Sequence, residues 1–150
     1  MSSSALLISS ESLALPATPA SGLPAVQAKS KGDAAALTRR GILRAKNGDL
    51  AGAIVDYGAA LEADPDHLTA RANRGVASFH HGDYVTAEAD CSRAIQLSPE
   101  LSKAWLVRGL ARAKLGLPEA EDDLLHFAEL SPQSKYLSLA RRALRDLDRA

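Results

Sequence analysis

The amino-acid sequence predicts an all-α fold, a right-handed superhelical solenoid of three helix-turn-helix hairpins and a capping helix. Three observations lead to this prediction. The composition is 46% hydrophobic but only 4% aromatic, and much of the apolar content is Ala and Leu, which both have high helix propensity. A pattern of small residues and prolines repeats every 34 residues from position 34. An amphipathic segment follows the last repeat.

The repeats define the first six helices. Residues 34–67, 68–101 and 102–134 align with one another, and the last segment is one residue short in the turn after Gly116. Each segment has room for two helices and a short turn. We therefore expect helices at about 35–47, 51–63, 69–81, 85–97, 103–115 and 118–130.

Small residues recur where two helices must approach closely or where a helix must end. Glycine at repeat position 8 lacks a Cβ, so the two helices of a hairpin can pack closely, and glycine at position 15 can adopt the left-handed conformation that ends a helix. A proline near the end of each repeat separates one hairpin from the next. These residues are Gly41, Gly75 and Gly109, then Gly48, Gly82 and Gly116, and finally Pro65, Pro99 and Pro132.

The order of large and small residues resembles the tetratricopeptide repeat over about three quarters of the chain. Large residues fill positions 4 and 24, and small residues fill position 20 and, in two repeats, position 27. The residues that carry the resemblance, besides the glycines and prolines, are Trp105, Tyr57, Cys91 and Leu124, with Ala53, Ala87, Ala120, Ala60 and Ala94. Cys91 is accordingly interpreted as a core residue rather than a nucleophile.

Arginine and aspartate also recur in register. An arginine precedes each glycine of position 8, and an aspartate occupies position 23 of each repeat. We predict three ion pairs, Arg40 with Asp56, Arg74 with Asp90 and Arg108 with Asp123, each joining the two helices of one hairpin. The arginine column is therefore interpreted as structural and not as a ligand site.

The last apolar face of the array requires a cover, which residues 132–149 can provide as a capping helix. Its apolar stripe consists of Tyr136, Ala140, Ala143, Leu144 and Leu147, while four arginines lie off the stripe and are interpreted as a solvated face.

Residues 1–33 differ from the repeats in composition. They are rich in Ser, Ala and Pro and nearly free of charge, which predicts a disordered tail. No basic residues precede the apolar stretch near Leu6, and Ser9, Ser10 and Glu11 interrupt it, so a secretory signal is poorly supported. A Ser-rich, acid-poor start is also typical of organellar or export signals. The tail is thus either a flexible extension or a targeting segment.

Composition and spacing exclude several classes of function. Eighteen Lys and Arg balance eighteen Asp and Glu, which argues against a nucleic-acid or membrane-surface protein. No apolar run approaches the roughly 20 residues of a membrane span. Cys91 and four scattered His form no metal-ligand pattern, and adjacent His80 and His81 point to different sides of a helix. We expect no enzyme, no cofactor, no metal and no small-molecule substrate.

The resemblance implies that the first helix of each repeat lines a concave groove, through positions 2, 5, 6, 9, 12 and 13. The position 9 side chains would form an apolar floor and the position 13 side chains a basic rim. Carried onto this chain, these positions name Thr38, Arg39, Ile42, Lys46, Asn73, Val76, Phe79, His80, Lys103, Leu106, Val107, Leu110 and Lys114. A peptide with apolar anchors and some negative charge would suit this surface.

Some tetratricopeptide proteins hold the C-terminal carboxylate of heat-shock chaperones with a clamp of five polar residues. At two of the corresponding positions this chain keeps the clamp residues, Asn73 and Lys103. The other three positions hold Thr38, Ile42 and Val107 instead. The clamp is therefore incomplete.

The sequence predicts a non-catalytic protein-interaction module, an adaptor or assembly factor that binds a partner peptide or helix. Two alternatives stay open. One is a dedicated chaperone or co-chaperone, either similar to secretion chaperones or binding heat-shock chaperones. The other is a structural subunit or effector targeted by its tail. We expect the cytoplasm as its location, or an organelle or export if the tail is a signal.

Overall fold

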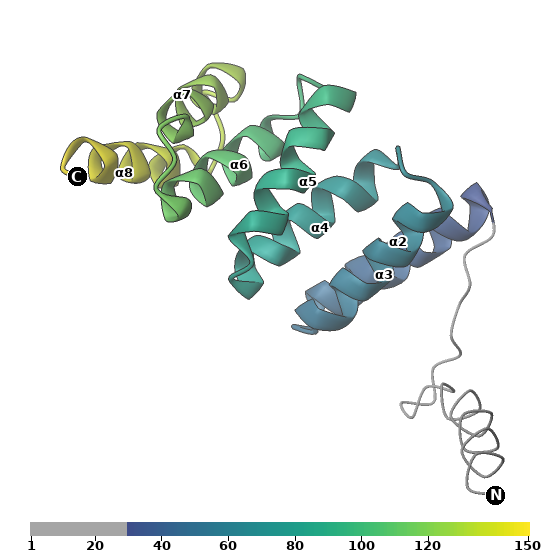
Figure 1. Ribbon diagram of the computed structural model, residues 1–150. Coiled ribbons are helices and arrows are strands. Elements are labelled where there is room, and N and C mark those ends of the chain that lie inside the picture. Colours follow the sequence, from purple (N-terminus) through teal and green to yellow (C-terminus); the bar gives the residue numbers. More distant parts are fainter. Residues whose placement is uncertain (1–29) are drawn as a thin grey trace, which may run out of the picture.

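The computed structural model describes residues 30–150, which form seven helices and contain no strand. Consecutive helices pack against each other from one end of this part of the chain to the other (Figure 1). The helices are α2 (Lys31–Lys46), α3 (Leu50–Ala63), α4 (Leu68–His81), α5 (Tyr84–Leu97), α6 (Ser102–Leu115), α7 (Ala120–Leu130) and α8 (Leu137–Asp148). The predicted all-α superhelical fold is confirmed.

The first helix begins earlier than predicted. Ser30 caps it: the Ser30 hydroxyl accepts a hydrogen bond from the Asp33 backbone N–H at 3.3 Å and donates one to the Asp33 carboxylate at 3.0 Å. This cap satisfies one of the free N–H groups at the helix start. Residues 31–33 are therefore helical, and the predicted end of the tail at residue 33 lies too late. The rest of the predicted tail lies outside the described residues.

The turn between the two helices of each hairpin depends on a left-handed glycine. Gly48, Gly82 and Gly116 have φ values of +86°, +92° and +70°, and no other described residue has a positive φ. The side chains of most residues disfavour this conformation, which glycine adopts freely. The predicted role of these three glycines is confirmed.

The glycine at position 8 lets a large side chain of the partner helix approach the backbone. A Cβ added to Gly41 would lie 2.6 Å from the Tyr57 ring. The same addition to Gly75 would lie 2.8 Å from Cys91 Sγ. These distances are shorter than any relaxed carbon contact. The close packing that the sequence predicts is therefore present, and Cys91 is a buried core residue.

Two helices are shorter than predicted. The second helix of the third hairpin, α7, begins at Ala120, where the Ala120 N–H bonds to the Leu117 carbonyl across a turn that contains Pro118. The capping helix spans 137–148 instead of 132–149. A second turn precedes it, in which Ser134 N–H bonds to the Ser131 carbonyl and Leu137 N–H to the Ser134 carbonyl. Both turns contain a proline, which cannot donate a backbone hydrogen bond.

Three apolar clusters form the core. The first joins the first and second hairpins, the second joins the second and third, and the third joins the third hairpin to α8. The last one is completed by α8, whose Ala140, Ala143, Leu144 and Leu147 pack on Leu106, Leu124 and Phe127. The helix therefore covers the final apolar face, as a capping helix must in a repeat array.

All three predicted ion pairs are present. Arg40 binds Asp56 with hydrogen bonds of 2.8 and 2.9 Å, and both donors come from one guanidinium group. Arg74 binds Asp90 at 2.7 and 2.8 Å, and Arg108 binds Asp123 at 2.7 and 2.9 Å. Each pair connects the two helices of one hairpin through a buried aspartate.

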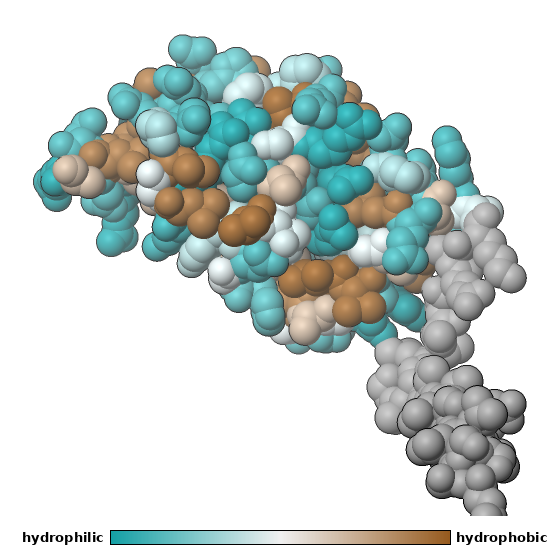
Figure 2. Space-filling view, viewed as in Figure 1, coloured by the Kyte–Doolittle hydropathy of each residue, from teal (hydrophilic) through white to brown (hydrophobic). Residues whose placement is uncertain are grey.

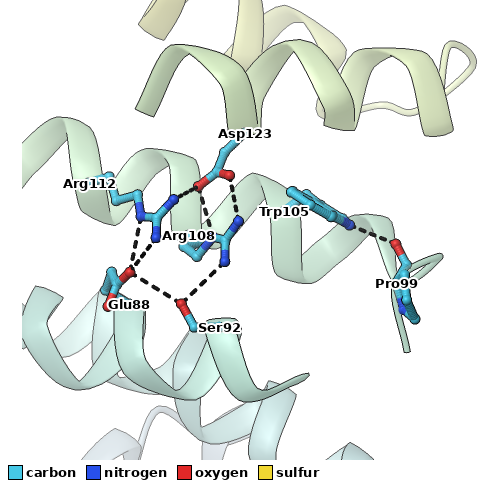
Figure 3. A network of polar contacts seen from close by, with 7 residues as sticks. All are labelled: Glu88, Ser92, Pro99, Trp105, Arg108, Arg112 and Asp123. Atoms are coloured by element: carbon cyan, nitrogen blue, oxygen red, sulfur yellow. Dashed lines mark hydrogen bonds and ion pairs between the residues drawn. The ribbon is translucent and has the colours of Figure 1, made fainter. Parts of the chain in front are cut away.

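A second arginine joins the third hairpin to the one before it (Figure 3). Arg112 donates to Asp123 at 3.1 Å and, with two other nitrogens, to Glu88 on α5 at 2.8 and 3.0 Å. Arg108 also reaches back to Ser92 Oγ at 3.3 Å. This network fixes the second hairpin relative to the third. No pattern within a single repeat reveals it, because the contacts connect different repeats.

Candidate partner-binding groove

The first helices of the hairpins border three adjoining pockets. The first pocket, about 560 Å³, lies between α2, α3 and α4. The central pocket, about 320 Å³, lies between α4, α6 and the start of α8, and the end pocket, about 460 Å³, lies between α6 and α8. The first and central pockets share Val76, His80 and Tyr136, and the central and end pockets share Phe79, Leu110 and Leu139. The three together form one groove.

Most of the groove residues predicted from the sequence line these pockets. They are Ile42, Lys46, Asn73, Val76 and His80 in the first pocket, Phe79, Lys103, Leu106, Val107 and Leu110 in the central one, and Lys114 in the end pocket. The residues at position 9 are partly buried and those at position 13 are exposed. Apolar side chains at position 9 and basic ones at position 13 therefore line the pockets, and the binding of a partner there stays a prediction.

Thr38 and Arg39 do not line the groove. Thr38 is only 3% exposed, and its hydroxyl donates to the Ala34 carbonyl at 2.7 Å. Together with Ala34, Leu37 and Gly41 it belongs to the buried face of α2, so its hydroxyl has no free donor for a ligand. Arg39 is exposed but borders none of the three pockets. Their inclusion in the predicted groove is wrong.

The capping helix supplies a wall that the sequence-based prediction missed. Tyr136 stands in the first and central pockets, Leu139 in the central and end pockets, and Arg142, Ala143 and Leu147 in the end pocket. Figure 2 shows apolar surface at the end of the molecule that contains α8. One signal in the sequence could have identified the wall: Leu139 is a large apolar residue outside the predicted stripe. In the structure its side chain is 44% exposed.

The groove carries positive charge although the whole chain is neutral. Lys46, Lys103, Lys114 and Arg142 line the three pockets, and Asp146 is the one acidic side chain among the lining residues. The whole chain has a formal net charge of zero. A partner with negative charge would therefore be attracted to this face rather than to the molecule in general.

Asn73 and Lys103, the two retained clamp positions, contact each other. The Lys103 ammonium donates to Asn73 Oδ1 at 3.0 Å. The other three positions offer no donor to a ligand here: Ile42 and Val107 are apolar, and the Thr38 hydroxyl is used within its own helix. The clamp is incomplete in the structure as it is in the sequence.

Cys91 takes no part in the groove. It is fully buried beneath Gly75, and burial, followed by the nearby Asp90 carboxylate, raises the pKa of its thiol from 9.0 to about 12. Since the thiolate is the reactive form of cysteine, the thiol is unreactive near neutral pH.

The comparisons with known proteins match this architecture. A family model described as "Tetratricopeptide repeat" matches residues 38–102. The solved structure of the first TPR of Spaghetti (RPAP3), bound to the HSP90 peptide SRMEEVD, is 31% identical in sequence, with a TM-score of 0.72, and the match covers 81% of this chain and 95% of that one. The chain belongs to the tetratricopeptide repeat family.

Two further solved domains of the family are similar. The second TPR domain of human RPAP3, in complex with the HSP70 peptide SGPTIEEVD, is 34% identical with a TM-score of 0.69, covering 77% of this chain and 95% of that one. The Arabidopsis OM64 TPR domain is 28% identical with a TM-score of 0.72, and the match covers 77% of this chain and 97% of that one. No curated protein sequence matches the chain significantly. Within residues 30–150, no helix combines the length and apolar content needed to cross a bilayer.

Proposed function

We propose that this tetratricopeptide repeat protein is a non-catalytic adaptor or assembly factor that binds a segment of a partner protein in its groove. The observation that carries the proposal is the continuity of the groove, in which three pockets share apolar side chains from α4, α6 and α8. An apolar row open to solvent is unusual in a monomeric protein without a partner. The resemblance of the fold to domains whose structures were solved with bound peptides supports the same class of function.

The groove is formed before the partner arrives. Its floor rests on the cores of the hairpins, and α8 packs on the apolar face of the third hairpin. The network of Arg112 with Glu88 holds the second hairpin against the third. A preformed surface does not lose conformational entropy when it binds, so more of the contact free energy appears as affinity. The partner segment is expected to supply apolar side chains for the floor and negative charge for the lysines.

A second candidate is a co-chaperone that binds the acidic C-terminus of a heat-shock chaperone. The relatives with bound SRMEEVD and SGPTIEEVD peptides favour it, as do Asn73 and Lys103 in the central part of the groove. The absence of donors at Ile42 and Val107 argues against it, because a terminal carboxylate needs several hydrogen bonds that converge on it.

A pair of double variants tests the proposed function. Val76→Glu with Leu110→Glu places two charges on the groove floor. Val55→Glu with Val85→Glu, on α3 and α5, places two charges on residues that are each 67% exposed and border none of the three groove pockets. We expect the groove variant to lose the partners that the wild-type chain captures from its own cells, as identified by mass spectrometry, and the control to keep them.

Circular dichroism and thermal unfolding establish that both variants are folded. A folded groove variant that retains every partner of the wild-type protein would refute the proposal. Partners lost equally from both double variants would place the binding surface elsewhere.

A further inference from the structure

The cations of the groove are distributed along it rather than gathered at one point. Lys46 lines the first pocket, Lys103 the central pocket, and Lys114 and Arg142 the end pocket. A terminal carboxylate concentrates its charge on two oxygens, which need several donors directed at the same place. Cations spread over successive pockets instead match carboxylates spread over successive residues of a ligand.

A large apolar surface lies between the two groups of cations at the α8 end. Phe79, Leu110 and Leu139 line both the central and the end pocket. Lys103 belongs to the central pocket alone, and Lys114 and Arg142 belong to the end pocket alone. An apolar side chain seated on the shared surface would therefore have a cation beyond it in either direction. Lys103 gives one hydrogen bond to Asn73 and keeps two ammonium protons for a ligand.

We propose that the groove recognises an internal segment of a partner protein in which a large apolar residue lies between acidic residues, and that it requires no free C-terminus. This inference rests on the proposed function of the groove and specifies the chemistry of the partner. It distinguishes this chain from the structural relatives that hold the peptide SRMEEVD.

A protein segment fits these features better than another anionic partner. Nucleic acids and anionic membranes present repeated charges, and proteins that bind them carry a broad basic surface. Here four cations are separated by an apolar floor, and the whole chain has no net charge. The apolar anchor therefore has to come from the same ligand as the carboxylates.

Two peptide libraries presented to the full chain test the inference. One displays random peptides between two folded domains, so that neither end is free, and the other displays random peptides with a free C-terminus. We expect the internal library to yield binders with an apolar residue between acidic residues. A synthetic version capped at both ends should bind as tightly as the uncapped one, within about twofold, and more tightly than SRMEEVD.

Adjacent residues on α8 provide matched variants. Arg142 and Arg141 are both exposed, but of the two only Arg142 lines one of the three groove pockets. Arg142→Glu should weaken binding of the selected peptide about tenfold, and Arg141→Glu less than about twofold. Leu139→Ser tests the anchor, with Leu125→Ser as its control, because the two leucines are 44% and 46% exposed and Leu125 lines none of the three groove pockets.

Several results would overturn the inference. These are binders that depend on a free C-terminal carboxylate, binders without flanking acids, and equal losses from Arg142→Glu and Arg141→Glu. A single-stranded oligonucleotide and a phosphatidylserine vesicle are tested as well. If either binds the groove as tightly as the peptides, the partner is a polyanion and not a protein segment. The proposed function itself fails if neither library gives a peptide whose binding is abolished by the double substitution Val76→Glu, Leu110→Glu.

Discussion

At the scale of single residues, the aspartate at position 23 is the polar centre of each hairpin. Asp56, Asp90 and Asp123 are all buried, and each accepts hydrogen bonds from two arginines. The second arginine comes from position 11 in the first and third repeats. In the second repeat Ser78 occupies that position, and Arg71, seven residues earlier on α4, approaches Asp90 instead. The same need for counter-charge is met by different residues.

Replacing Asp123 by Asn should destabilise the protein strongly. Arg108, whose side chain is only 13% exposed, would then have no carboxylate partner, while Arg112, 17% exposed, would keep Glu88 alone. An uncompensated buried charge costs about 3 to 5 kcal/mol, so we expect a loss of about 3 kcal/mol in the free energy of unfolding. Urea titration followed by circular dichroism measures it.

Asp122 provides the matched control for Asp123. It is the neighbouring residue in the first turn of α7, so its replacement by Asn removes the same charge from the same helix end, but its side chain is exposed. Exposed substitutions of this kind change stability by less than about 0.5 kcal/mol. Equal effects of the two substitutions would show that the buried ion pair contributes nothing specific.

At the scale of helices, the distance between the two members of a hairpin depends on glycine. Gly75 faces Cys91, and Gly41 and Gly109 face Tyr57 and Leu124 in the other two hairpins. Helix interiors otherwise disfavour glycine by about 1 kcal/mol relative to alanine. The glycines at position 8 therefore trade local helix stability for close packing, whereas a glycine without such a neighbour gains nothing from its missing side chain.

Gly75→Ala and Gly58→Ala should consequently change stability in opposite directions. A Cβ at Gly75 would meet Cys91 Sγ at 2.8 Å, which forces α4 and α5 apart, and overpacking of this kind costs about 1 to 3 kcal/mol. At Gly58, inside α3, the nearest atom would be Arg74 Nη1 at 3.7 Å. There alanine should stabilise by about 0.5 to 1 kcal/mol through its helix propensity.

Thermal and urea unfolding of the two variants, side by side with the wild type, decide the question. Destabilisation at both positions would mean that an alanine side chain does not fit at either glycine. Stabilisation at both would mean that the hairpin adapts to a methyl group without cost.

At the scale of the whole molecule, the parts predicted in most detail from the sequence are those that occur three times. Gly41, Gly75 and Gly109 mark the close contacts because one packing problem is solved in the same way in each repeat. The ion pairs followed from the same register. The capping helix occurs once and was predicted from its apolar stripe, but only as a cover for the third hairpin. The wall formed by Leu139 and Arg142 belongs to α8, which has no counterpart in the repeats.

Position in the repeat did not predict the environment of every side chain. Thr38 occupies a groove position by count, yet its side chain lies on the buried face of α2, where its hydroxyl is satisfied by the Ala34 carbonyl. A short side chain that bonds to its own helix can be buried without loss, and the sequence alone does not distinguish this from exposure to a ligand.

The links between hairpins differ in strength along the molecule. Glu88 and Arg112, which join the second hairpin to the third, have side chains 25% and 17% exposed and share two hydrogen bonds. Asp66 and Arg93, which join the first to the second, are 61% and 45% exposed and share one. Solvent screens the exposed pair, and exposed pairs contribute about 0 to 1 kcal/mol. The second and third hairpins should thus behave as the more rigid unit.

Double-mutant cycles measure this difference directly. With alanine at each position, we expect a coupling free energy of about 1 to 2 kcal/mol between Glu88 and Arg112, and less than about 0.5 kcal/mol between Asp66 and Arg93. The cycle cancels the separate loss of the Arg112 contact with Asp123, because that contact is lost whether or not Glu88 is present. Raising the salt concentration should reduce the second coupling more than the first, since exposed charges are screened most. Equal couplings at both junctions would contradict a rigid pair of hairpins and would leave the groove between α4, α6 and α8 without the support attributed here to Glu88.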